Sequence, residues 1–290
     1  MNVFAQSLVG GVLIGGLYAT MSIGVSLVWG ALRLINLVLL GITMVAGYLA
    51  YDLAVLWGWD PLLAAVVVVP VMAVASFFVQ WLFEAMKLDE FQSLLVTFGI
   101  LTIAIAAVKT RWSADFRQIP RELNPYVASS LSLGDLAFPL ALLIAFVIAL
   151  GIGVGTHLLL ERSMFGKAVR AVAQDRDIAQ VVGVDYRRLS RLLSAGAGGI
   201  SGLAGVFVAI LQALHPNLAV EWFGVVFSVV ILGGIGSALG SLIAGVVIGA
   251  VGAAAAVLIG AAAAPLATFL VLILTLLIRP QGLLGGETGG

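Results

Sequence analysis

Apolar stretches long enough to cross a lipid bilayer follow one another along almost the whole chain. A membrane-spanning helix needs about 20 predominantly apolar residues. We therefore predict an all-α polytopic membrane protein with about eight or nine transmembrane or half-spanning helices. The candidate segments are 8–29, 34–57, 62–83, 94–108, 136–160, 192–214, 222–235, 239–259 and 265–278.

The composition supports this class and excludes several others. The 290 residues are 62% hydrophobic and 10% charged, whereas a soluble globular protein carries about 25% charged residues. Most of the chain must therefore lie in lipid, which excludes a soluble enzyme and a nucleic-acid-binding protein. The chain contains no Cys, which excludes disulfides, thiolate catalysis and Cys-ligated metal.

Lys and Arg concentrate in the segment 161–191, and this bias sets the expected orientation. We place this segment in the cytoplasm, which puts the N-terminus outside and the C-terminus inside. Residues 1–290 are then one membrane domain with an outer loop at 109–135 and an inner loop at 161–191. The cations of the outer loop argue mildly against this orientation, although its acidic residues offset most of them: Lys109, Arg111, Arg117 and Arg121 against Asp115, Glu122 and Asp135.

The inner loop reads as two short helices. Asp175 suits the N-cap of the second helix, because its carboxylate can accept a free backbone N–H, and Gly183 suits the end of that helix. A short amphipathic pair of helices beneath a membrane domain fits a groove on a soluble partner. The alternative is a basic loop that touches lipid headgroups and sets the topology.

Several motifs, in order along nearly the whole chain, resemble one family. The inner-loop pattern Arg-Ser-x-x-Gly-Lys-Ala-x-Arg-Ala-x-Ala-x-Asp resembles the cytoplasmic loop of branched-chain amino-acid ABC-transporter permeases of the LivH/LivM type. The Gly-rich segment and the C-terminal ending also match this family. The residues that carry the resemblance are Arg162 to Asp175, Gly183-Val184-Asp185, Ile231-Leu232-Gly233-Gly234-Ile235-Gly236-Ser237 and Arg279-Pro280-Gln281-Gly282.

The resemblance implies a permease subunit of an ATP-driven importer in the bacterial inner membrane. The solute would be a branched-chain or other hydrophobic amino acid, or a related small organic acid or amide. The implied partners are a second homologous permease chain, two cytoplasmic ATPase subunits, a periplasmic solute-binding protein and membrane lipid, with no nucleic acid. The residues expected to couple the inner loop to the ATPases are Arg162, Gly166, Lys167, Arg170 and Asp175.

The chain itself is not expected to be an enzyme or to bind a cofactor. A phosphate-binding P-loop needs Gly-x-x-x-x-Gly-Lys-[Ser/Thr]. The nearest match, Gly166-Lys167, has Glu161 where the first Gly should be and Ala168 where the hydroxyl should be. ATP and Mg²⁺ are therefore expected on the partner subunits. The two His residues, His157 and His215, fall on opposite membrane faces, which argues against a shared metal site.

Uncharged polar residues inside the spans are candidates for the solute pathway. Asn36, Thr43 and Thr97 can line a passage and offer hydrogen bonds. The alternative is hydrogen bonding between helices. Glu84 lies near an inner helix end, and we expect it to face water.

Glycines in the second half of the chain are expected to pack helices closely or to serve as a hinge. The candidates are Gly233, Gly234, Gly236 and Gly240. The short stretch 222–235 is expected to be a broken or half-spanning helix, which is where transporters often place their pathway. The run 236–249 is also a candidate for a seam between subunits.

Two other function classes compete with the importer. A stand-alone secondary transporter or channel for a small solute would need its own coupling ion or gate, and such proteins often carry carboxylates or His in the membrane. An intramembrane enzyme would need a catalytic cluster, and neither Gly-x-Ser-x-Gly nor His-Glu-x-x-His is present. The charge-poor interior and the basic inner loop favour the importer.

Two departures from the family pattern predict the solute. The family commonly has Phe-Ala-His-Gly and an acidic residue after its Asn, whereas Asn36 is followed by Leu37-Val38-Leu39-Leu40-Gly41, and Val225 replaces a frequent Lys. Both changes make the interior more apolar, so we expect a less polar or differently charged solute than an ordinary amino acid. Uptake of leucine measured against aromatic and aliphatic acids checks this. A clear preference for leucine would contradict it.

Overall fold

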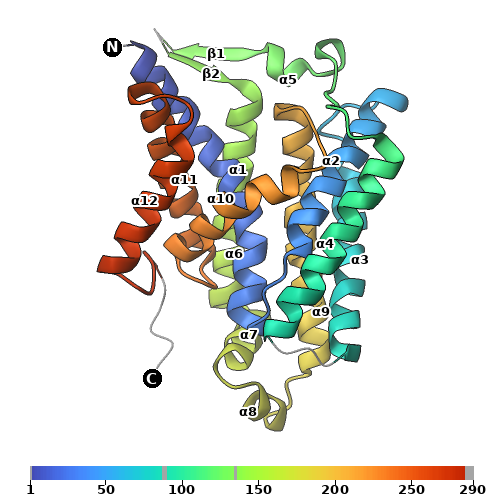
Figure 1. Cartoon of the computed structure of the whole chain (residues 1–290). Helices are drawn as coiled ribbons and strands as arrows, with labels where there is room; N and C mark the ends of the chain where they lie inside the picture. Colours follow the sequence, from blue (N-terminus) through green and yellow to red (C-terminus); the bar gives the residue numbers. More distant parts are fainter. Residues whose placement is uncertain (1, 87–89, 134–135, 285–290) are drawn as a thin grey trace.

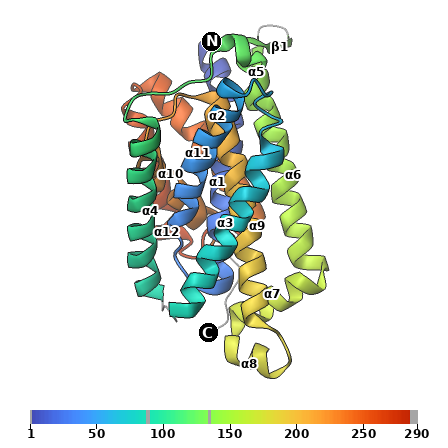
Figure 2. The same ribbon diagram turned by 90° about the vertical axis from the view of Figure 1, so that its right-hand side faces the viewer.

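The computed structural model describes residues 2–86, 90–133 and 136–284, and it is built almost entirely of helices (Figures 1 and 2). Residues 134 and 135, the end of the loop expected at 109–135, lie outside the described residues. The elements are α1 (Asn2–Leu32), α2 (Val38–Leu56), α3 (Ala65–Met86), α4 (Glu90–Trp112), η1 (Arg121–Leu123), α5 (Pro125–Ala128), β1 (Ser130–Leu133), β2 (Leu136–Pro139), α6 (Leu140–Arg162), α7 (Met164–Gln174), α8 (Arg176–Val181), α9 (Tyr186–Leu211), α10 (Leu218–Gly233), α11 (Ala238–Leu258) and α12 (Ala263–Ile278).

The predicted all-α membrane class is confirmed. Within the described residues, seven helices are long and apolar enough to cross a membrane, and α10 and α12 are shorter apolar helices. Every predicted stretch coincides with one of these nine. The stretch 136–160 was predicted to begin too early, because Leu136–Pro139 forms strand β2, paired antiparallel with β1. The residues of β2 are apolar like those of α6, so the sequence does not show where the strand ends and the helix begins.

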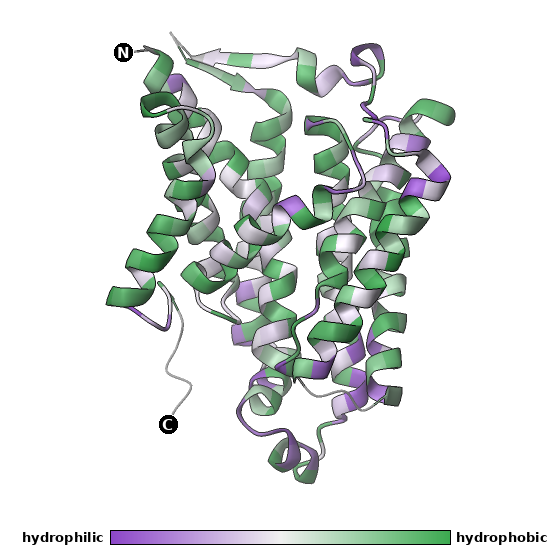
Figure 3. Ribbon diagram, viewed as in Figure 1, coloured by the Kyte–Doolittle hydropathy of each residue, from purple (hydrophilic) through white to green (hydrophobic). Residues whose placement is uncertain are grey.

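Hydrophilic residues gather at the two ends of the bundle (Figure 3). Helices α7 and α8 lie at one end, and the β1–β2 hairpin and α5 lie at the other, beside the start of α1 (Figure 1). The Gln6 side chain fixes the hairpin to α1, since its amide accepts from the Ala137 N–H at 2.9 Å and donates to the Ala137 carbonyl. The N-terminus and the inner loop therefore lie at opposite ends, as the predicted topology requires.

Helices α1 and α11 touch along their backbones. A Cβ built on Gly15 would lie 2.5 Å from the Gly245 carbonyl oxygen, and one on Gly249 would lie 2.1 Å from that of Gly11. Small residues let membrane helices approach this closely. The glycine face of α11 is therefore covered by α1 of the same chain, and the expectation that 236–249 forms a seam between subunits was wrong for this face.

A row of polar side chains joins α3 to α9. Ser76 donates to the Ser194 carbonyl at 2.7 Å, and the Ser194 hydroxyl donates to Gln80 Oε1 at 3.0 Å. All three residues are fully buried or nearly so. Residues 76, 80 and 84 lie one helical turn apart, so they form one stripe along α3.

The stripe ends in an ion pair. Arg191 of α9 donates to Glu84 Oε2 through Nε at 2.8 Å and through Nη2 at 2.6 Å, and the Ser190 hydroxyl donates to Glu84 Oε1 at 2.5 Å. Only 8% of the Glu84 side chain is exposed. The expectation that Glu84 faces water was wrong, because its partners come from a helix about a hundred residues away in the sequence.

Removal of this pair should destabilise the bundle. Glu84→Ala leaves Arg191 without its counter-charge. We expect a loss of roughly 2–3 kcal/mol, less than the value of about 3–5 kcal/mol for a fully buried pair, since 27% of the Arg191 side chain is exposed. Thermal unfolding in detergent, followed by tryptophan fluorescence, measures it.

The matched control is Glu161→Ala. The Glu161 side chain is 58% exposed and pairs with His157 at 3.3 Å, so its removal should cost less than about 0.5 kcal/mol. Equal unfolding midpoints for the two variants would contradict the prediction.

Candidate functional site

The connection between α9 and α10 folds back into the bundle. The Leu214 backbone pairs with that of Arg117 through two hydrogen bonds of 2.6 and 2.9 Å. The Leu214 side chain packs on the middle of α2, where a Cβ on Gly47 would lie 3.1 Å from Leu214 Cδ2. Helix α10 therefore begins within the bundle, beside α1 and α2, and runs obliquely from there (Figure 1).

Helix α10 is too short to cross the bilayer alone. Its 16 residues extend about 24 Å at 1.5 Å per residue, whereas the hydrocarbon core is about 30 Å thick. The prediction of a half-spanning helix at 222–235 is confirmed in this sense.

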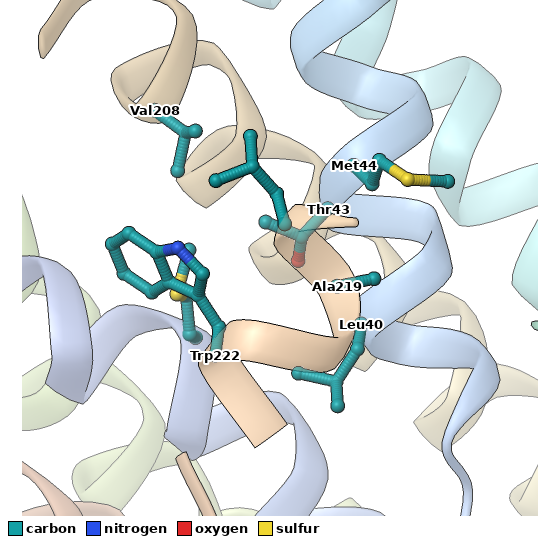
Figure 4. Close-up of a pocket in the computed structure, with 8 residues that line it drawn as sticks. Leu40, Thr43, Met44, Val208, Ala219 and Trp222 are labelled. Atoms are coloured by element: carbon teal, nitrogen blue, oxygen red, sulfur yellow. The ribbon is translucent and has the colours of Figure 1, made fainter. Parts of the chain in front are cut away.

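A small apolar cavity lies at the start of α10 (Figure 4). The space between its lining residues is about 10 Å³, which is roughly the room that one water molecule needs. The cavity is closed to any larger solute in this conformation. Its lining comes from α1, α2, α9 and α10: Met21, Leu40, Thr43, Met44, Val208, Leu218, Ala219 and Trp222.

Thr43 carries the one hydroxyl in that lining. Its hydroxyl donates to the Leu39 carbonyl of its own helix at 3.1 Å. The hydroxyl hydrogen is therefore used within α2, and only the oxygen lone pairs face outward. The cavity wall is thus apolar with a single acceptor.

Asn36 and Thr97, predicted with Thr43 as pathway residues, lie elsewhere. Asn36 Oδ1 accepts from the Val38 N–H at 3.0 Å, and the Thr97 hydroxyl lies within reach of two carbonyls, Ile35 at 3.2 Å and Leu94 of its own helix at 3.1 Å. Both residues are buried at the connection between α1 and α2. Thr97 thus contacts the connection between α1 and α2, as the alternative interpretation expects, whereas the Asn36 bond lies within that connection. Neither residue lines the cavity, and their role in a pathway stays a prediction.

Sequence reasoning gave no role to Trp222, which forms one side of the cavity. Its ring packs edge-on against Tyr18 of α1 with 5.6 Å between ring centroids. The sequence shows Trp222 at the start of a short apolar stretch. It does not show that this stretch begins inside the bundle, which is what places Trp222 at the cavity.

The turn that follows α10 is rich in glycines, and these pack closely against neighbouring backbone. Gly234 and Gly236 have φ of +95° and +87°, a conformation that favours glycine. A Cβ on Gly240 would lie 1.9 Å from the Gly233 carbonyl oxygen, and one on Gly30 would lie 2.3 Å from Gly236 Cα. Close packing by these glycines is confirmed, and their service as a hinge stays a prediction.

The inner loop contains the two predicted helices. Asp175 caps α8, since its carboxylate accepts from the N–H groups of Asp177 at 2.8 Å and Ile178 at 2.9 Å. Gly183 ends the segment with φ of +93°. Ser163 caps α7 in the same way, accepting from the Gly166 N–H at 3.0 Å.

The residues expected to contact the ATPases divide into two groups. Arg162 and Lys167 are exposed. Gly166 is buried where α6 turns into α7, and a Cβ there would lie 2.0 Å from the Leu160 carbonyl oxygen. The Arg170 guanidinium donates to the same carbonyl. Gly166 and Arg170 thus stabilise the corner between α6 and α7, and Asp175 stabilises the corner between α7 and α8.

The loop also exposes apolar side chains that sequence reasoning did not single out. Ile178 is 63% exposed, Val181 87% and Val182 72%, all at or beside α8. An exposed apolar patch rimmed by polar residues is typical of a surface that contacts a protein or a membrane.

The described residues contain no group of three or more His, Asp or Glu side chains that could hold a metal ion. His157 pairs with Glu161 at 3.3 Å and His215 with Glu221 at 3.4 Å. The two pairs lie on different parts of the bundle, since one is on α6 beside the inner loop and the other flanks the start of α10.

Comparison with known proteins covers nearly the whole chain. Residues 7–279 match the family described as the permease component of branched-chain amino acid transport systems. A high-affinity branched-chain amino acid transport permease protein of Pseudomonas aeruginosa, BraD, is 25% identical over 97% of this chain and 96% of its own. The LivH permease protein of Escherichia coli K12 is 24% identical over the same shares. No solved structure matches.

The corner between α6 and α7 gives a direct test of the loop. Gly166→Ala places a methyl group against the Leu160 backbone, so the corner must open. We expect trypsin to cleave at Lys167 or Arg170 several-fold faster in the purified protein, because local opening exposes the backbone. The control is Gly155→Ala on α6, where a Cβ meets nothing within 4 Å. Trypsin should cleave this variant at the same rate as the unmodified protein. Equal rates in the two variants would show that the corner does not depend on Gly166.

Proposed function

The chain belongs to the family of branched-chain amino acid transport permease components, and from this premise we propose that its cavity at the start of α10 is the closed solute passage. The chain is a multi-pass membrane permease subunit of an ABC importer and not an enzyme. The solute we propose is a branched-chain or other hydrophobic amino acid, or a related small organic acid or amide. The apolar lining of the cavity is the observation that carries this proposal.

The lining suits a solute with an apolar body. Seven of its eight residues are apolar, and burial of apolar surface against them contributes about 25 cal/mol per Å². A solute carboxylate would find the positive end of the α10 dipole, because Leu218, Ala219 and Trp222 of its first turns line the same space. Half-helix N-termini serve anionic groups of substrates in other transporters.

The inner loop would couple this passage to ATP hydrolysis on partner subunits. We propose that the exposed apolar residues of α8, together with Arg162 and Lys167, contact a cytoplasmic ATPase. ATP and Mg²⁺ would be held there, because the family places the chain as a permease component only. A second permease chain and a periplasmic binding protein would complete the assembly, with α7 and α8 on the cytoplasmic side of the inner membrane.

Two substitutions separate the passage from the coupling surface. Ala219→Phe adds a ring to a cavity of about 10 Å³, so import should stop while the ATPase still copurifies. Val181→Asp puts a charge on an 87% exposed apolar position, so the ATPase should be lost, with affinity lowered about tenfold or more. Copurification with quantitative mass spectrometry and ATP-driven uptake into proteoliposomes measure both.

Leu131→Asp is the matched control. Leu131 is 53% exposed on β1, at the opposite end of the bundle, and its substitution should leave the copurification of the ATPase unchanged. If the unmodified chain purifies alone and moves solute without ATP, the importer assignment fails and a secondary transporter or channel takes its place.

A further inference from the structure

Arg33 has a backbone conformation that L-residues rarely adopt. It follows the last residue of α1 with φ of +53°, and its N–H donates to the Trp29 carbonyl at 2.9 Å. Glycine usually occupies this position after a helix. An arginine there costs roughly 1 kcal/mol or more in backbone energy. Contacts of its side chain can offset this cost.

The Arg33 side chain reaches the inner loop. Nη2 donates to the carbonyl of Ala173 at 3.3 Å, in the last turn of α7. Cations are favoured at this end of a helix by its free carbonyls and its dipole. The bond therefore joins the end of α1 to the end of α7 across 140 residues of sequence.

The backbone that follows Arg33 contacts α4 and leads into α2. Two residues on, the Ile35 carbonyl lies 3.2 Å from the Thr97 hydroxyl of α4, which is also 3.1 Å from the Leu94 carbonyl of its own helix. Asn36 Oδ1 accepts from the Val38 N–H at 3.0 Å at the start of α2. One and two turns further along α2, Leu40 and Thr43 line the cavity. A displacement at Arg33 would therefore reach one wall of the proposed passage.

An open cleft lies beside the bond. Its volume is about 430 Å³, and its walls are the end of α1, the end of α7, the start of α8 and the start of α9. Arg33 shares this lining with the charged residues Asp175, Arg176 and Asp177. Helix α7 is therefore not packed tightly against α1 at this point, and the Arg33 side chain spans a region with room for movement.

We propose that Arg33 is a positioning residue that transmits movement of α7 to the connection between α1 and α2, and so opens or closes the cavity. The inference rests on the proposed function, because α7 moves only if a docked ATPase drives it. Arg33 acts through the backbone that it holds, and it touches neither solute nor nucleotide.

Arg33→Gly is the sharpest variant. Glycine suits φ of +53°, so the fold is kept while the guanidinium is lost. In the assembled transporter in proteoliposomes, ATP hydrolysis should continue while import per ATP falls about tenfold. Arg33→Lys, which keeps a cationic donor, should fall less. Arg121→Ala removes an exposed arginine at the opposite end and should change nothing.

A second readout follows the cavity itself. The chain has no Cys, so Thr43→Cys adds its only thiol to the cavity wall. The rate at which a maleimide modifies this thiol, measured on this chain by mass spectrometry, should change with ATP when Arg33 is present. In the Arg33→Gly background the change should disappear, whereas a merely structural role for Arg33 would leave it intact.

The outcomes distinguish the two proposals. If Arg33→Gly imports and responds to ATP as the Arg121→Ala control does, the inference about Arg33 is overturned and the importer assignment stands. If the chain with Arg33 intact neither imports with ATP nor changes its labelling rate, the proposed function fails and the inference fails with it.

Discussion

Lipid offers no hydrogen bonds, so each backbone N–H and C=O inside the bilayer needs a partner within the protein. Helix α10 tests this constraint, because the chain that precedes it is not helical and lies inside the bundle. The outer segment supplies the missing partners: the Arg117 backbone pairs with Leu214, and the Asn124 side chain donates to the Ile210 carbonyl at 2.9 Å. These bonds allow α10 to begin inside the bundle, where its first turns line the cavity.

Helix α1 connects the parts that function requires. It packs backbone to backbone on α11, meets the glycine turn after α10 through Gly30, and reaches α7 through Arg33. Its Met21 lines the cavity. Contacts between backbones cannot slide without a clash, whereas an open cleft lies beside the contact between α1 and α7 that Arg33 bridges. This difference is consistent with the proposed role of Arg33.

The helices could be predicted because each is a local pattern: apolar length for the spans, Asp175 and Gly183 for the inner loop. Contacts between distant segments could not. Glu84 and Arg191 each look like a residue at a helix end that faces water, and only the fold brings them within 2.6 Å. Asn36 and Thr97 were chosen as pathway residues for their polarity, yet the cavity is lined by Trp222 and other apolar side chains. Polarity indicates what a residue can bond, and it does not indicate which neighbour lies within reach.

The cavity has room for about one water molecule and walls that offer a single acceptor. Hydrophobic constrictions in channels block ions by dewetting. As the proposed passage, the cavity in this conformation would therefore hold back ions and protons together with the solute. An idle copy would then not drain the gradients that the membrane maintains.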